Sequence, residues 1–444
     1  MSRRDDILKS FNKYKEETDE RVKLGIEQNR KGFAVITVKD KDGNPVPGVK
    51  IKAKQKRHEF MHGANLFMLD EFESEEKNEK YKALFRNAFN TATLPFYWNG
   101  NEPVRGKLRY EKDSPKLYRR PAPDLCLEYC SENNIIPKAH CLSYFAHHPE
   151  WLDNLEIPDI KRLLEKRYSE LSERYSDKIP GWEVINELLC CGVWSFSGRE
   201  KFYIADDVFD WNFRLAEKYF RSNELIVNEA TQNIWSWESY NYTRSAYYMM
   251  IKQGLEHGLR IDTVGMQYHV FMTPDEERTK LTDDLYNPKT IFSVLDTYEK
   301  LGKPIQITEV TLPAYTDSAE DEQLQAELIE QLYSIWFSHK ATEAVIYWNL
   351  PDGYAAFAPK GDMSAGENFY RGGLLRFDLS KKPSYEMIHH LFNERWHTET
   401  ETESKADGIA KFKGFYGEYE LSANGKTFDI MLSKSGYNDF EITV

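Results

Sequence analysis

Between about residues 58 and 397 the sequence repeats one pattern, in which a short apolar run is followed by an amphipathic helical stretch. Apolar runs that alternate with helices are typical of a parallel sheet, whose strands are buried on both faces. Eight such units favour a closed (β/α)₈ TIM barrel, an α/β fold, over an open sheet. The expected strands are 59–66, 89–94, 137–142, 181–186, 224–228, 263–269, 304–309 and 344–348, and the expected helices lie near 75–88, 124–133, 159–175, 206–221, 241–257, 288–301, 320–339 and 383–395.

The segment before the barrel, residues 1–57, has a different character. A polar leader over 1–30 is expected to be helical. Two alternating segments within 33–56 flank a turn rich in Gly, Asn and Pro, which predicts a β-hairpin.

The segment after the barrel, residues 398–444, opens with a polar, acidic connector over 398–404. Short strands are expected at 410–421 and 428–432. Neither chain end has enough strands to bury a face by itself. We therefore expect the two ends to join as one small accessory β-sandwich beside the barrel.

The composition excludes several classes of partner. The 444 residues carry 59 Lys and Arg against 72 Asp and Glu, a net charge of −13, with no basic run, which argues against nucleic acid. No stretch approaches the roughly 18 apolar residues of a membrane span. The five cysteines and the start of the chain, Met1 to Asp6, suggest a cytoplasmic protein, or a secreted one from which a signal peptide has been removed.

No cofactor and no metal are expected. The cysteines do not have the paired spacing of a zinc site. The adjacent pairs His147-His148 and His389-His390 are poor ligand sets, because neighbouring side chains rarely reach one ion. The sequence does not indicate an oligomeric state.

Two glutamates end expected strands at positions where a barrel carries its chemistry. Glu187 follows the fourth strand and Glu309 ends the seventh, so both face the barrel mouth. A retaining glycosidase needs two carboxyl groups about 5–5.5 Å apart, one as nucleophile and one as proton donor. Asn186 adds a neutral donor for a sugar 2-hydroxyl. We therefore predict Glu187 as general acid/base and Glu309 as nucleophile, with a carbohydrate as substrate.

These motifs resemble glycoside hydrolase family 10, whose characteristic members are endo-β-1,4-xylanases. Trp182 to Glu187 (Trp-Glu-Val-Ile-Asn-Glu) is similar to the family's acid/base motif Trp-Asp-Val-Val-Asn-Glu, and Ile307 to Val310 is similar to its nucleophile motif Ile-Thr-Glu-Leu. The resemblance implies that His269 holds the nucleophile and that further residues contact the sugar: His140, Tyr144, Gln267 and Trp348. It covers about 60–395 and implies cleavage of xylan-derived or decorated oligosaccharides.

The second strand departs from the family pattern. Where the family carries Glu, Asn and Lys against the sugar, this chain has Phe96, Tyr97 and Trp98, so we expect aromatic stacking there, with Trp98 as a substrate contact. Several arginines lie in the loops after the second and eighth strands: Arg105, Arg109, Arg119, Arg120 and Arg371. They could pair with a uronic acid substituent of the substrate. The more ordinary interpretation is that they pair with acidic groups of the chain itself.

Two other functions stay open at this stage. One is a β-glycosidase of different specificity, exo-acting or releasing a non-sugar aglycone. The other is a sugar-binding barrel without turnover, although the presence of Glu187, Glu309 and Asn186 argues against it. A metal-dependent hydrolase is disfavoured for want of a His-x-His strand.

Overall fold

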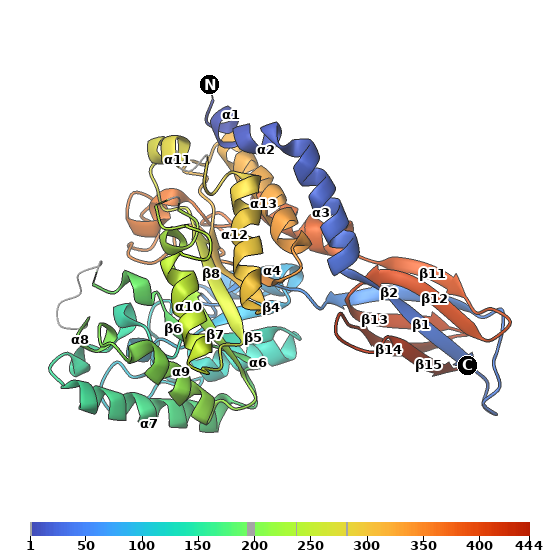
Figure 1. The fold of residues 1–444 in the computed structure, drawn as a ribbon, viewed down its shortest axis with the longest axis horizontal. Coiled ribbons are helices and arrows are strands. Elements are labelled where there is room, and N and C mark those ends of the chain that lie inside the picture. Colours follow the sequence, from blue (N-terminus) through green and yellow to red (C-terminus); the bar gives the residue numbers. More distant parts are fainter. Residues whose placement is uncertain (1, 193–199, 237, 281–282) are drawn as a thin grey trace.

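The computed structural model describes residues 2–192, 200–236, 238–280 and 283–444 (Figure 1). Its larger part is a closed barrel of eight parallel strands in the order β10-β3-β4-β5-β6-β7-β8-β9, which confirms the expected fold. The barrel strands are β3 Met61–Asn65, β4 Thr91–Pro95, β5 Ile136–His140, β6 Gly181–Asn186, β7 Glu224–Glu229, β8 Thr263–His269, β9 Ile305–Thr311 and β10 Thr342–Tyr347.

Helices surround the barrel and cover its strands. Eight of them follow the expected strand–helix alternation: α4 Glu75–Ala88, α6 Pro123–Glu132, α7 Ile157–Tyr175, α9 Val208–Tyr219, α10 Ala246–Glu256, α12 Pro288–Tyr298, α13 Ala319–Ser338 and α14 Pro383–His390. The leader forms α1 Arg3–Ile7, α2 Lys9–Lys13 and α3 Lys15–Asn29, and short helices occur in loops at α5 Trp98–Asn101, α8 Glu200–Tyr203 and α11 Pro274–Lys280. None of the helices in the described residues is long and apolar enough to cross a membrane.

Local sequence signals explain where these elements begin. The Ser74 hydroxyl accepts a hydrogen bond from the Lys77 amide at the start of α4, and the Asn287 side chain accepts one from the Lys289 amide at the start of α12. Both residue types satisfy amide groups that a helix leaves free in its first turn. Strand β9 is buried along its whole length, as expected for a strand packed between side chains inside the barrel and helices outside it.

The two chain ends form one accessory β-sandwich. One sheet has the order β12-β1-β15 and the other β11-β2-β13-β14. Apolar side chains from both sheets share a core, among them Ile36, Ile51, Phe412 and Leu421. The strands are β1 Lys31–Lys39, β2 Lys50–His58, β11 Glu399–Glu403, β12 Ile409–Phe415, β13 Gly417–Ala423, β14 Lys426–Leu432 and β15 Asp439–Thr443.

The predicted hairpin over 33–56 is wrong in its pairing. Both segments are strands, but β1 pairs with β12 and β15, whereas β2 pairs with β11 and β13 in the opposite sheet. The connection from Lys39 to Lys50 is longer than the two to five residues usual for a hairpin loop, and it holds two prolines, which lack amide donors.

The acidic connector predicted over 398–404 is also wrong, because Glu399–Glu403 is strand β11. It pairs with the lysine-rich strand β2, and Lys52 and Glu399 form an ion pair of 2.8 Å. Opposite charges on paired strands stabilise a segment that has too few apolar residues to be recognised alone.

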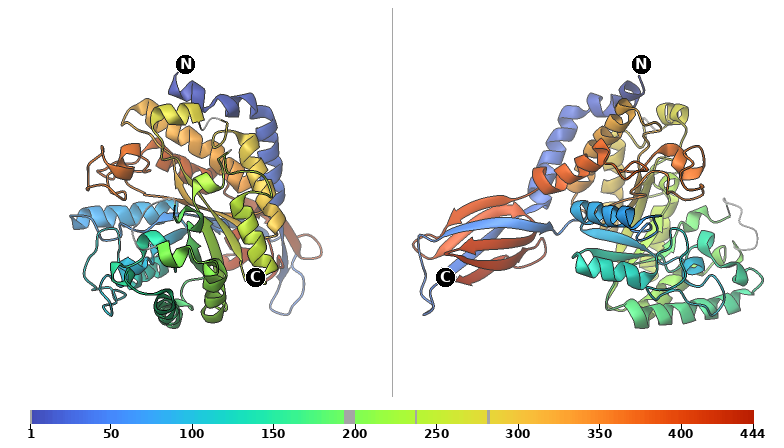
Figure 2. Two further views of the ribbon diagram at one scale, coloured as in Figure 1. Left: turned by 60° about the vertical axis from the view of Figure 1, so that its left-hand side comes forward. Right: turned by 180° about the vertical axis from the view of Figure 1, so that it is seen from behind.

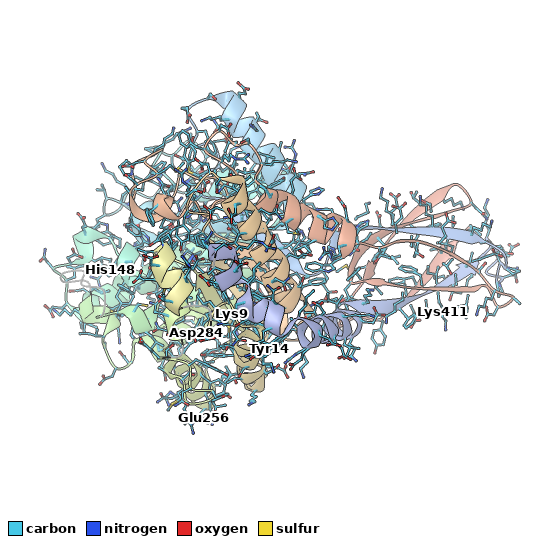
Figure 3. The ribbon with its side chains drawn as sticks, turned by 90° about the horizontal axis from the view of Figure 1, so that it is seen from above. Lys9, Tyr14, His148, Glu256, Asp284 and Lys411 are labelled. Atoms are coloured by element: carbon cyan, nitrogen blue, oxygen red, sulfur yellow. The ribbon has the colours of Figure 1, made fainter. Side chains whose placement is uncertain are left out.

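The sandwich lies at the end of the barrel where the strands begin. A cavity of about 490 Å³ between the two parts is lined by Met61 and Thr342, at the starts of β3 and β10, and by Tyr416 and Lys434 of the sandwich. Figure 2 shows the sandwich projecting from one side of the barrel. In Figure 3 the labelled Lys411 of β12 and His148, which follows β5, lie at opposite ends of the molecule. The carboxyl ends of the barrel strands therefore remain clear of it.

Deleting residues 400–444 should destabilise the whole protein. The deletion removes the partner strands on both sides of β1 and of β2 and exposes the shared core. We expect insoluble protein or a melting temperature lower by at least about 5 °C. The control is Tyr437→Ser, because that side chain is 96% exposed. A soluble truncation that melts with the full chain would refute the expectation.

Candidate active site

The two predicted carboxylates lie close together at the mouth of the barrel. Glu187 follows the last residue of β6, and Glu309 lies in β9. Between them Gln267 of β8 donates hydrogen bonds from one nitrogen, Nε2, to Glu187 Oε1 at 2.7 Å and to Glu309 Oε1 at 3.0 Å. Since both oxygens contact the same nitrogen, they are no more than about 5.7 Å apart.

Glu187 is in an environment that favours a protonated carboxyl group. Burial and the neighbouring charge of Glu309 raise its pKa to about 7, although hydrogen bonds from Tyr144 and Gln267 act in the opposite direction. The Tyr144 hydroxyl donates to Glu187 Oε2. The backbone of Glu187 is left-handed, with φ 53°, an uncommon conformation for a residue with a side chain.

Glu309 is surrounded by hydrogen-bond donors. Its Oε1 accepts from Asn228 Nδ2 at 2.8 Å as well as from Gln267. His269 Nε2 lies 3.2 Å from Oε2, and His269 Nδ1 contacts the Thr311 hydroxyl at 2.9 Å. Several donors therefore hold the carboxylate of Glu309 in a fixed orientation at the barrel mouth.

A buried charge network lies beneath the pair, and its centre, Glu183, was missed by the sequence analysis. Lys138 Nζ donates to Glu183 Oε1 at 2.5 Å, and His140 Nδ1 contacts Glu183 Oε2. Although burial opposes it, the charges of Lys138 and His140 lower the pKa of Glu183. Burial likewise opposes the charged form of His140, but Glu183 and Glu309 raise its pKa. His140 Nδ1 is 3.9 Å from Glu309 Oε1, so the network places positive charge beside that carboxylate.

Asn228 of β7 is a second residue to which the sequence analysis assigned no role at the site. Besides its bond to Glu309, its Nδ2 donates to Asn186 Oδ1 at 2.9 Å, and its Oδ1 accepts from the Thr308 hydroxyl at 2.5 Å. Gln267 Nε2 also contacts Asn186 Oδ1, at 3.4 Å. Both contacts use the amide oxygen of Asn186, which orients its nitrogen to donate elsewhere. The signal available in the sequence was a polar residue at the carboxyl end of an expected barrel strand.

An aromatic cluster that includes Trp348 and Tyr144, both predicted as sugar contacts, lies beside His140. Trp348 lies with its ring centre 5.3 Å from that of His140, and Tyr97 lies 5.0 Å from the same ring. Phe67 packs edge-on against Trp348 at 5.1 Å. Phe67, Tyr97, Cys141 and Trp348 form one buried cluster, and the half-buried Tyr144 packs on it. We call this cluster, with Tyr144, the aromatic wall.

Of the three aromatic residues after β4, only Tyr97 belongs to the wall. Phe96 is buried against Tyr175 and Trp182. Trp98 is 4% exposed and donates from Nε1 to Glu102 at 2.9 Å. Its predicted role as a substrate contact is therefore corrected.

The reason is geometric. Strand β4 ends at Pro95 and helix α5 begins at Trp98, and this turn of the chain directs Phe96 and Trp98 toward α7, where Phe96 contacts Tyr175 and Trp98 contacts Arg167.

Most of the loop arginines are engaged away from the carboxylates. Arg109 donates to backbone carbonyls of Gly100, Pro115 and Arg120. Arg119 donates to the Tyr354 carbonyl and to Asn349 Oδ1. The remaining two stand apart from the aromatic wall: Arg371 is paired with Asp317, and Arg105 is exposed over Trp151. Arg120, in contrast, lies on Tyr97.

Three described residues at this site carry side chains of the kinds that bind metal ions. Oxygen or nitrogen atoms of His140, Glu183 and Glu309 lie within 4.8 Å of one another. Lys138 already supplies a positive charge to Glu183. Because a second cation would compete with that lysine, we assign no metal to the site.

Comparison with known proteins agrees with this architecture. Residues 61–389 match the model of glycosyl hydrolase family 10. The chain is 23% identical over 411 residues to the anti-sigma-I factor RsgI6 of Acetivibrio thermocellus, a match covering 89% of this chain and 45% of that protein. It is 25% identical over 338 residues to endo-1,4-beta-xylanase 1 of Arabidopsis thaliana, a match that covers 74% of this chain and 31% of that protein. The chain thus spans less than half the length of these two relatives.

Solved structures show the same fold. Xylanase 10B from Thermotoga petrophila in complex with xylobiose superposes with a TM-score of 0.59 at 20% identity, over 76% of this chain and 95% of that one. Native xylanase 10B from Thermotoga maritima superposes with a TM-score of 0.57 at 22% identity, over 76% of this chain and 96% of that one. At these identities the likeness concerns the fold alone.

Proposed function

The chain belongs to glycosyl hydrolase family 10, and we propose that it is a retaining β-glycosidase that cleaves β-1,4-xylosidic bonds in xylan-derived or decorated oligosaccharides. The observation that carries the proposal is the shared donor Gln267 Nε2, which keeps the oxygens of Glu187 and Glu309 within about 5.7 Å. Retaining enzymes have their carboxyl groups about 5–5.5 Å apart, whereas inverting enzymes need roughly 6.5–9.5 Å to admit a water molecule.

The two glutamates then act in two steps. Glu309 attacks the anomeric carbon while Glu187 donates its proton to the leaving oxygen, which gives a covalent glycosyl-enzyme and a free aglycone. A water molecule next gives its proton to Glu187 and attacks the anomeric carbon, which releases Glu309 and restores both groups. The raised pKa of Glu187 suits it to both roles near neutral pH.

The surrounding residues would position the sugar. The nitrogen of Asn186 is oriented to donate to a 2-hydroxyl group, because its oxygen is held by Asn228. Trp348 and Tyr97, both buried, pack beside His140 and hold its ring in place at the site. His269 and Asn228 hold the carboxylate of Glu309.

The alternatives differ in substrate or in turnover. A β-glycosidase of different specificity, exo-acting or releasing a non-sugar aglycone, would use the same pair of glutamates. Only the substrates that the protein hydrolyses distinguish it from a xylanase. An inert sugar-binding barrel has no need of the raised pKa at Glu187 or of the donors on Glu309, and these features favour an enzyme.

The test is the configuration of the first product. We expect hydrolysis of xylohexaose and of an aryl β-xyloside, with the β-anomer appearing first in a ¹H NMR time course, because two displacements restore the original configuration. Early α-anomer would contradict the retaining mechanism. Binding of these sugars without hydrolysis would favour the inert barrel.

A further inference from the structure

Arg120 lies against the aromatic wall of the candidate active site. Its guanidinium carbon is 4.3 Å from the ring centre of Tyr97 and 5.5 Å from that of Phe67. Tyr97 in turn is 5.0 Å from His140 and 6.2 Å from Tyr144, ring centre to ring centre. One aromatic ring therefore separates this cation from the residues that contact Glu187 and Glu309.

The charge of Arg120 is not neutralised by a carboxylate in the described part of the chain. Its hydrogen bond there runs from Nη1 to the carbonyl oxygen of its neighbour Arg119, at 2.8 Å. Burial lowers the pKa of Arg120 to about 10, although Tyr97 acts to raise it, so the group stays protonated at neutral pH. Buried or half-buried charges are normally paired, since removing them from water is costly.

Two of the groups that act electrostatically on Arg120 are further arginines, Arg119 and Arg109. The guanidinium of Arg119 lies 5.7 Å from the same Phe67 ring, but Arg119 is held by Asn349 and the Tyr354 carbonyl. Glu367 attracts Arg120 electrostatically but forms no ion pair with it, and its Oε2 accepts from Asn349 Nδ2 at 2.8 Å. An acidic protein of net charge −13 thus keeps an unpaired cation beside its candidate active site.

The position of Arg120 is built into the loop. Gly100 lies under its side chain, where a Cβ atom would be 3.1 Å from Arg120 Cδ, so a larger residue would press on the stem. Arg109 donates to the Arg120 carbonyl at 3.2 Å and fixes the backbone there. Part of the surface of Arg120 is exposed, whereas Tyr97, on which it lies, is buried.

We propose that Arg120, stacked on Tyr97, binds a carboxylate of the substrate and makes the enzyme prefer β-glycosides that carry an acidic sugar. A guanidinium presents parallel N–H donors that match the two oxygens of a carboxylate, and stacking on an aromatic ring fixes its plane. The inference rests on the proposed function for its substrate class. Arg120 determines specificity and takes no part in bond cleavage.

The decisive measurement is binding, which is independent of turnover. In a Glu309→Ala background, calorimetry compares a xylo-oligosaccharide bearing one glucuronic acid branch with the same compound after reduction of its carboxyl group. We expect the acidic form to bind at least about tenfold more tightly. Arg120→Gln should remove this difference while changing the affinity for the reduced form less than about twofold, and Arg120→Lys should keep part of it.

The experiment includes a control variant and a second type of acidic ligand. Arg105→Gln, an exposed arginine of the same loop, should leave the preference intact. Comparing an aryl β-glucuronide with an aryl β-glucoside in the same assay distinguishes an acidic backbone sugar from an acidic branch. Should Arg120→Gln not fold, raising NaCl from about 0.05 to 0.5 M must weaken only the acidic ligands.

The proposal is overturned if the Glu309→Ala protein binds the acidic and the reduced oligosaccharide with equal affinity, or binds neither of them. It is also overturned if Arg120→Gln weakens the binding of both oligosaccharides to the same extent. Hydrolysis of neutral xylohexaose by the unmodified protein is scored separately. Hydrolysis without any acidic preference leaves the proposed function standing and removes only the role of Arg120.

Discussion

Glu309→Ala is expected to lower kcat on xylo-oligosaccharides by roughly 10⁴-fold or more, because it removes the atom that forms the covalent intermediate. The nearest carboxylates of the described residues are engaged by other groups. Glu183 is buried and bound by Lys138 and His140, and Glu187 is held on the other side of Gln267. The measurement is the initial rate of reducing-sugar release, with the melting temperature as a check on folding.

Glu320→Ala serves as the matched control for this loss. Glu320 is an exposed glutamate in the first turn of α13, and its removal should leave kcat unchanged. A folded Glu309→Ala protein that keeps more than a tenth of the activity would show that Glu309 is not the nucleophile.

Glu187→Ala should have an effect that depends on the leaving group. Xylo-oligosaccharides depart as poor leaving groups that need a proton, so we expect kcat to fall by about 10³-fold or more on them. Activated aryl β-xylosides need little proton donation, so formation of the glycosyl-enzyme should be much less affected. Added azide should then accelerate turnover and give a β-glycosyl azide, because a small anion replaces the water that Glu187 no longer activates.

The pH profile gives an independent measure of the same residue. Glu187 acts as an acid only while protonated, so kcat/KM of the unmodified enzyme should fall as the pH rises through about 7. In Glu187→Ala this alkaline limb should disappear for aryl β-xylosides. A variant that retains the limb, or one that loses activity equally on both substrate classes, would assign the proton donor to another group.

The sequence by itself determined the barrel and the two glutamates. Strand and helix positions follow from local periodicity, as in α4 and β6, whose bounds match the expected segments. Glu187 and Glu309 could be placed because the carboxyl ends of all barrel strands meet at one mouth, so a position along a strand already implies a position in space. The closed strand order also follows from sequential parallel connections.

Only the tertiary structure decided which partners the polar residues have. Glu183 and Asn228 lie inside barrel strands, and their roles arise from contacts with two other strands, β5 and β9, and with each other. The pairing of β1 and β2 likewise depends on strands that are more than 340 residues further along the chain. Such contacts leave no local periodic signal.

The orientation of individual side chains in loops was equally beyond the sequence. Phe96, Tyr97 and Trp98 have the same apolar, aromatic character, yet only Tyr97 faces the carboxylates, because the path of the chain after β4 turns its neighbours toward α7. The arginines of the following loop differ in the same way. Arg109 and Arg119 are held by backbone carbonyls, and Arg120 is left over Tyr97 without a carboxylate partner in the described chain. Local propensity sets where strands and helices form, but the direction of a side chain in a loop is set by the packing of elements distant in sequence.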